Sequence, residues 1–448
     1  MVGASPRAVV LGVLLCVTLN LLAVHSYVVA DRYTGFADHF NTVGAIFLLF
    51  LLVLATLALG KAWPRGRLLP GEFTVIYAML LVAAAVPTMG LGGYLFGLLS
   101  GVTYYANPEN RWLTTLHPLL PGWAVPKQAE AMRYFYEALP AGAAIPWGIW
   151  ARPLLWWGVF ALAFYAVSIT AMIVIRRQWV EREHLAYPLT SVPLALAESL
   201  AAGSRGGILR ARLTWLGFLT AFCPAAYVWA HAWVPAMSAF PGLSLGRVVS
   251  LGPNGPQVSL LLDPLQVGLT YLVNLDVACG VWVFHWLIVL EQWIFGRLGI
   301  AQGPGDPHAA GGAALSSQQV GALLLLVILS LWTARKSLGN DLKLAFRQQG
   351  GAREGEVLPI RWAVVAMAGG LLGMGFFLRR TGMPVALVAV FLLAALALFF
   401  GVTRVLVQTG LGRLRAPVAA APFVVGILGS RPFRRAGMAA LGLTFVWA

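Results

Sequence analysis

The feature that most constrains this chain is a succession of apolar runs, each about as long as a helix that crosses a lipid bilayer. A hydrocarbon core about 30 Å thick requires roughly 20 mostly apolar residues in helical form. Ten runs meet this requirement, at residues 8–30, 42–60, 73–99, 153–175, 213–236, 257–274, 276–296, 318–334, 362–378 and 384–402. The pattern predicts an all-α, polytopic transmembrane helical bundle that forms one membrane-embedded domain over residues 1–448.

The composition excludes a soluble protein, because 59% of the residues are hydrophobic and only 10% are charged. The net charge of +15 does not indicate nucleic-acid binding, since the basic residues lie in short connections between apolar runs. Cys16, Cys223 and Cys279 lie within apolar runs and form no Cys/His cluster, so neither disulfides nor a metal site are expected. We expect membrane lipids as partners, no nucleic acid, no cofactor and no metal. The sequence leaves the oligomeric state open.

The basic connections predict the orientation, because cationic loops stay in the cytoplasm. Segments 61–72, 176–212 and 335–361 are rich in Arg and Lys, whereas segment 31–41 has one Arg and two Asp. We therefore expect a cytoplasmic N-terminus, a cytoplasmic interfacial segment at 176–212 and an external, Trp-rich interfacial cap at 101–152. An even number of crossings must separate the last two basic segments. This parity predicts that 257–274 also crosses and forms a hairpin with the next span.

The C-terminal part lacks a further full span. Segment 416–430 is short and apolar, and we expect it to be re-entrant. The last apolar run has thirteen residues, from 436 to 448, which is fewer than the roughly 17 that a crossing helix requires. We therefore expect the natural protein to continue beyond this sequence.

Four polar residues in one apolar segment are the first candidate site: Asn274, Asp276, His285 and Glu291. Ionisable groups within spans are costly, and each is a functional hypothesis. In a helix, Asn274 and His285 lie within about 20° of each other, and the two carboxylates share another face. This arrangement predicts a substrate or proton path. The structural alternative is that Asp276 caps the helix, Glu291 pairs with Arg297 and His285 bonds to a neighbouring helix.

A second candidate is the segment containing Pro87, Gly90, Gly92 and Gly93. Proline removes a helix hydrogen bond, and glycines loosen the backbone, so a broken helix is expected here. Transporters bind substrates or ions at such breaks. Small residues also serve ordinary helix packing, which is the alternative.

An ordered series of motifs carries a family resemblance. The motifs are YYANPENRW (104–112), IPWGIW (145–150), RRQWVEREHLAYPL (176–189), PLALAE (193–198) and LWTAR (331–335). Together they resemble an uncharacterised family of bacterial polytopic membrane proteins that is similar to the oligopeptide transporter (OPT) superfamily. The resemblance implies two related halves forming an internal pseudo-repeat, broken or re-entrant helices, and proton-coupled uptake of peptides or metal chelates. Family members tend to carry an acid within segment 403–412, where this chain has Gln408.

Arg182 and Glu183, in the cytoplasmic motif, form a third candidate site. A gate built on switchable ion pairs is the functional interpretation. The alternative is an interfacial helix start with solvated charges.

Two functional hypotheses follow. The first is an OPT-like secondary transporter in the bacterial cytoplasmic membrane, moving small peptides or metal chelates, without catalytic residues. The second is a membrane-embedded enzyme or assembly factor that acts on envelope or lipid-linked material through the external cap. The acids available to it in predicted external loops are Asp31, Asp38, Glu109, Glu130 and Glu137.

Overall fold

The computed structural model describes residues 5–30, 36–37, 43–62, 68–87, 91–200, 207–234, 236–238, 246–252, 255–261, 264–300, 312–347, 358–411 and 414–444. The chain forms two compact units whose segments alternate along the sequence. Unit 1 contains Met1–Gly93, Ala186–Gly303 and Arg404–Arg415, and unit 2 contains Tyr94–Leu185, Pro304–Thr403 and Ala416–Ala448. The sequence predicts one membrane-embedded domain with related halves, whereas these two units do not coincide with the two halves of the sequence.

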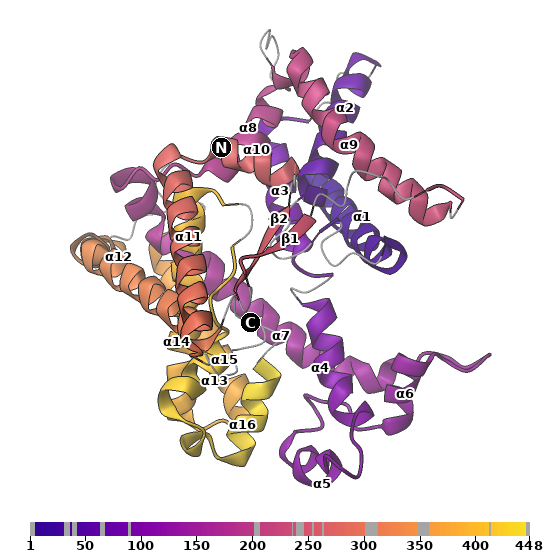
Figure 1. Cartoon of the computed structure of the whole chain (residues 1–448), viewed down its shortest axis with the longest axis vertical. Helices are drawn as coiled ribbons and strands as arrows, with labels where there is room; N and C mark the ends of the chain where they lie inside the picture. Colours follow the sequence, from indigo (N-terminus) through magenta and orange to yellow (C-terminus); the bar gives the residue numbers. More distant parts are fainter. Residues whose placement is uncertain are drawn as a thin grey trace. The chain divides into compact units, whose positions relative to one another are not determined.

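The predicted all-α, polytopic architecture is confirmed (Figure 1). Within the described residues, seven helices are long and apolar enough to span a membrane: Pro6–Val28, Val43–Gly60, Trp147–Arg182, Leu275–Leu298, Ala313–Leu344, Ile360–Arg380 and Val385–Thr409. The chain is therefore an integral membrane protein.

The core of unit 1 consists of helices α1 (Pro6–Ala30), α2 (Val43–Ala62), α3 (Pro70–Ala84) and α8 (Ser191–Glu198). Helix α1 packs along α3, as Figure 1 shows. Leu19, Leu49, Phe73, Ile76 and Leu80 are buried in this cluster. Two 3₁₀ turns, Pro188–Thr190 and Ile208–Arg210, flank α8 in the chain.

The rest of unit 1 corrects one prediction. Helix α9 (Arg212–Trp233) is followed by an antiparallel pair of strands, β1 (Gly246–Ser250) and β2 (Gln257–Leu261), and by helices α10 (Pro264–Leu272) and α11 (Leu275–Leu298). The prediction of one span over 257–274 is therefore wrong. Helix α10 has nine residues, about 14 Å at 1.5 Å per residue, which is too short to cross.

The long helices of unit 2 are α7 (Trp147–Arg176), α12 (Ala313–Arg347), α13 (Ile360–Arg380) and α14 (Val385–Thr409). A π-helical turn, Arg177–Arg182, continues α7. Helix α7 packs along α13, where the rings of Trp157 and Phe160 lie 5.0 and 4.7 Å from that of Phe377.

Two groups of short elements complete unit 2. The predicted cap contains the end of α4 (Gly92–Tyr104), α5 (Trp112–Thr115), the 3₁₀ turn His117–Leu119 and α6 (Ala129–Glu137). The C-terminal group contains α15 (Ala420–Leu428), the 3₁₀ turn Arg431–Phe433 and α16 (Arg434–Leu443). Helix α15 lies within the predicted re-entrant segment 416–430, and its nine residues are too few to cross alone.

The predicted run 73–99 is interrupted, as its proline and glycines predict: α3 ends at Ala84 and α4 begins at Gly92. One more predicted span differs from the structure. Helix α9 overlaps the predicted span 213–236 but is not among the seven sufficiently long and apolar helices of the described residues.

Candidate functional site

The four polar residues of the first candidate site lie on or next to α11 but do not converge. The Asn274 side chain caps the helix by accepting a hydrogen bond from the Asp276 amide at 3.1 Å. Asn274, Asp276 and His285 are exposed, and Glu291 is half-buried. The rise of the helix separates Asp276 from His285 by about 14 Å along the axis. The structural alternative places Asp276 at the helix cap, but the side chain that caps the helix is that of Asn274.

The second candidate site coincides with the break between α3 and α4. Pro87 follows the end of α3, and Gly92 and Gly93 begin α4, whereas Gly90 lies outside the described residues. The Gly92 amide donates to the Val86 carbonyl at 2.8 Å. A Cβ on Gly92 would lie 3.0 Å from the Pro87 carbonyl oxygen, so the tight return of the chain favours glycine here.

Arg182 and Glu183, the third candidate site, belong to a polar cluster at the end of α7. Arg182 forms an ion pair with Asp341 of α12, with Nη2 3.1 Å from Oδ2. Arg177 approaches the same carboxylate, with Nη1 3.5 Å from Oδ1. Glu183 accepts a hydrogen bond from Gln178 Nε2 at 2.8 Å. The two predicted residues thus meet at one cluster, although they do not pair with each other.

Gln178 is the centre of this cluster, which we call the α7–α12 cluster: Arg177, Gln178, Arg182, Glu183, Ser337 and Asp341. The buried Gln178 amide oxygen accepts from the Ser337 hydroxyl and, at 3.5 Å, from Arg182. The Asp341 side chain is 10% exposed, and that of Arg182 is 41% exposed. A carboxylate this buried depends on its cationic partners, because an unpaired charge in an apolar environment is strongly destabilising.

The backbone of the cluster has an uncommon geometry. Arg177–Arg182 form a π-helical turn, and such turns occur frequently at functional sites. Trp179 is buried within this turn, with its ring 5.3 Å from that of Phe400 in α14. Packing of Trp179 therefore fixes the turn, while Arg177 and Arg182 face Asp341.

Unit 1 contains a second buried carboxylate, Glu72, in the first turn of α3. Arg7 binds it through two nitrogens, at 2.8 and 2.6 Å, and Ser5 and the Leu69 amide also donate to it. The bonds from Arg7 contribute most to lowering the pKa of Glu72, which is about 2. Because these groups join the start of α1 to the start of α3, we interpret Glu72 as a structural anchor.

The cap is held together by aromatic rings and internal hydrogen bonds. The rings of Tyr104 and Tyr136 stack at 4.1 Å, and the Ser100 hydroxyl lies 3.0 Å from the Tyr136 hydroxyl. His117 Nε2 lies 3.1 Å from the Thr103 hydroxyl, and burial followed by the charge of Lys127 lowers the pKa of His117. These contacts describe a folded cap.

The acids of the cap do not gather into a catalytic group. Glu130 accepts from Tyr134, and Glu137 pairs with Arg133 at 3.1 Å, both within α6. Across the part of the chain that the structure describes, no group of three or more His, Cys, Asp or Glu side chains is suitably placed for a metal ion. Asp31 and Asp38 lie outside the described residues.

Sequence reasoning missed Asp341, Arg177, Gln178 and Ser337. The basic residues of segment 335–361 predict only a cytoplasmic loop. The available signal was that Asp341 is an isolated acid between Lys336 and Lys343, near the end of a long apolar helix. Such an acid requires a cation on a neighbouring helix, but the sequence does not say which one.

Comparison with known proteins gives one finding. The model of a family described as a family of unknown function (DUF6785) matches residues 2–448. No curated protein and no solved structure matches the chain.

Proposed function

The chain belongs to this family, DUF6785, and we propose that it is a secondary membrane transporter of the OPT-like type, whose substrates are small peptides or metal chelates. The observation that carries the proposal is the α7–α12 cluster. Charged side chains within membrane helices are expensive and usually mark transport paths or proton relays. Here a buried Asp341 and two arginines join the ends of two long apolar helices.

The cluster suits a gate because its two arginines are held differently. The Arg177 side chain is 12% exposed, whereas that of Arg182 is 41% exposed. Arg177 can therefore stay paired with Asp341 while Arg182 breaks its ion pair and becomes solvated. A charged substrate that arrives near Asp341 would compete with both pairs and allow the ends of α7 and α12 to separate.

The break between α3 and α4 supplies the substrate site in this proposal. Interrupted helices leave backbone groups free to bind peptides or ions near the middle of a membrane. Across the break, the Gly92 amide donates a hydrogen bond to the Val86 carbonyl.

The proposed location is the bacterial cytoplasmic membrane, with the N-terminus inside. The ion pairs join the basic ends of α7 and α12, as expected if both ends are cytoplasmic. This requires an even number of crossings between Arg182 and Asp341. The seven candidate spans of the described residues include two there, α11 and α12. The internal N-terminus also requires α3 and α4 to cross together as one broken helix between α2 and the cap.

An enzyme or assembly factor that works through the cap is less well supported. Glu130 and Glu137 have partners within their own helix, and Glu109 is in neither pair. The cap acids therefore do not form the opposed carboxylates that hydrolysis of lipid-linked material would use.

The proposal is tested by uptake into proteoliposomes that contain the purified chain. Labelled di- and tripeptides and labelled metal chelates are supplied with and without an inward proton gradient. We expect accumulation that requires the protein and rises with the gradient. Uptake that ignores the gradient would remove proton coupling, and absence of uptake for every substrate in both classes would contradict the proposed function.

A further inference from the structure

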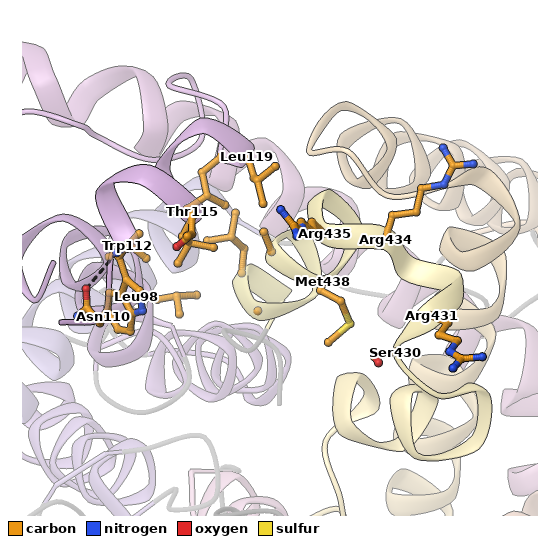
Figure 2. A pocket seen from close by; sticks show the side chains of 16 residues that line it. Leu98, Asn110, Trp112, Thr115, Leu119, Ser430, Arg431, Arg434, Arg435 and Met438 are labelled. Atoms are coloured by element: carbon orange, nitrogen blue, oxygen red, sulfur yellow. Dashed lines mark hydrogen bonds between the residues drawn. The ribbon is translucent and has the colours of Figure 1, made fainter. Parts of the chain in front are cut away.

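A groove of about 800 Å³ lies within unit 2, between the cap and the C-terminal helix α16. Its lining is mostly apolar and includes Leu98, Val102, Leu116 and Leu119 from the cap side and Met438 and Leu443 from α16. Figure 2 shows Leu98 and Leu119 on the cap side and Met438 on the α16 side. A ligand that fills it must therefore present apolar surface.

The same groove has a strongly cationic side. Arg431, Arg434 and Arg435 all belong to its lining, and no acidic side chain does. Figure 2 shows Arg435 extending toward Thr115 and Leu119, whereas Arg431 and Arg434 extend from the other side of the same short segment. Within the described part of the chain, none of the three arginines forms an ion pair with a carboxylate.

The groove lies at the end of two membrane helices. Helix α13 ends at Arg380 and α14 begins at Val385, and both are apolar enough to span. Helix α16 packs closely against the connection between them. A Cβ on Gly382 would lie 3.2 Å from Cβ of Ala436, and a Cβ on Gly437 would lie 3.3 Å from Cδ of Pro384. Since spans leave the hydrocarbon where such connections begin, α16 lies at the level of the lipid headgroups.

We propose that this groove binds an anionic phospholipid. The phosphate lies at Arg435, where a guanidinium group can form paired hydrogen bonds to phosphate oxygens. Arg431 and Arg434 raise the local positive potential, and the glycerol and upper acyl chain lie along Leu116, Leu119 and Met438. A free inorganic anion would satisfy the arginines but would leave the apolar walls uncovered. The combination of both surfaces at headgroup level selects a lipid.

The test measures lipid binding to the purified full chain in detergent by native mass spectrometry, with phosphatidylglycerol and phosphatidylcholine as probes. We expect phosphatidylglycerol to bind more tightly, and Arg435→Gln to weaken it about tenfold, which corresponds to the loss of one charge-assisted contact. Arg435→Lys keeps the charge but loses the paired geometry, so its affinity for phosphatidylglycerol should lie between those of the wild type and Arg435→Gln. Lys343→Gln, an exposed cation at the end of α12, is the matched control and should not change binding.

Three results would overturn the proposal: equal binding of the two lipids, unchanged phosphatidylglycerol binding by Arg435→Gln, or an equal loss in Lys343→Gln. Competition distinguishes the source of the phosphate. Millimolar inorganic phosphate should leave the bound lipid in place, and its displacement would assign the arginines to a soluble anion instead. Arg435→Gln should keep the wild-type melting temperature. If it does not, the comparison uses Arg435→Lys, for which unchanged lipid binding contradicts the proposal.

Discussion

Two buried carboxylates, Glu72 and Asp341, are neutralised by arginines in different ways. Glu72 is 2% exposed and receives a two-point contact from Arg7, a hydroxyl and a backbone amide. Asp341 is shared between Arg177 and Arg182, at 3.5 and 3.1 Å. The fully satisfied Glu72 fixes two helix starts, whereas the shared and partly exposed contacts of Asp341 allow exchange.

The first prediction concerns Glu72→Gln. The substitution keeps the shape of the side chain but removes the charge that Arg7 neutralises, so it should destabilise the protein by about 1–3 kcal/mol. The thermal unfolding midpoint in detergent measures this. Glu198→Gln, an exposed acid on α8 of the same unit, is the control and should have little effect.

The pKa of Glu72 gives a second prediction. Its pKa is lowered from an ordinary 4.5 to about 2 in the folded protein, chiefly by the bonds from Arg7. A lowered pKa stabilises the fold fully above the ordinary value, and this contribution is lost as the pH falls from about 4.5 toward about 2. The difference in unfolding midpoint between wild type and Glu72→Gln should therefore shrink over that range. An unfolding-midpoint difference that stays constant over this pH range would show that the charge of Glu72 does not stabilise the fold.

A third prediction concerns the α7–α12 cluster. Asp341→Ala removes the carboxylate that Arg177 and Arg182 share and should cost about 3 kcal/mol, whereas Arg182→Ala should cost less because Arg177 still pairs with Asp341. The double variant should be more stable than the sum of the two single effects implies. Strict additivity in unfolding midpoints would mean that the two side chains do not interact.

At the scale of elements, the connection between α13 and α14 depends on one glycine. Gly382 has φ +109°, and a Cβ there would also lie 3.2 Å from Cβ of Ala436. Gly382→Ala should therefore destabilise the docking of α16 by about 1–3 kcal/mol. Gly369→Ala in α13, where a Cβ would meet nothing within 4 Å, is the control. Equal melting temperatures for the two variants would contradict this account.

The apolar runs predicted the long membrane helices, because hydropathy within each run is enough to identify them. Every one of the seven candidate spans overlaps a predicted run, and the break between α3 and α4, which contains Pro87, was expected because proline and glycine act on their own backbone. The failure at 257–274 has a different cause. Residues 257–261 become a strand only by pairing with Gly246–Ser250, and a hydropathy pattern carries no information about that partner.

The candidate site was predictable to a smaller degree. Arg182 and Glu183 were identified from their local charge pattern. Their partner Asp341 is 159 positions away from Arg182 in sequence, and only the packing of α12 against the end of α7 brings it near. Long-range pairing of this kind follows from tertiary structure, so single-sequence reasoning could name the cations but not the acid they neutralise.

At the scale of the whole molecule, the two units draw on alternating segments of the chain. Within unit 2, the cap precedes α7 and the α7–α12 cluster follows it, so a helix long enough to span the membrane separates them. The two regions should therefore face opposite sides of the bilayer.

This gives a topological prediction. In a background without the three native cysteines, Ala141→Cys in the cap should react with an impermeant maleimide from outside intact cells. Lys343→Cys at the end of α12 should react only after permeabilisation. Labelling of both from the same side would show that α7 does not cross as proposed.

We propose that Asp341 operates a transport gate, and gradient-driven uptake by wild type and Asp341→Asn in proteoliposomes tests this most directly. Wild type should accumulate the labelled peptide or chelate, whereas folded Asp341→Asn should lose accumulation by at least about tenfold because the charge that Arg177 and Arg182 share is gone. Accumulation by Asp341→Asn at the wild-type rate would contradict a gate at Asp341.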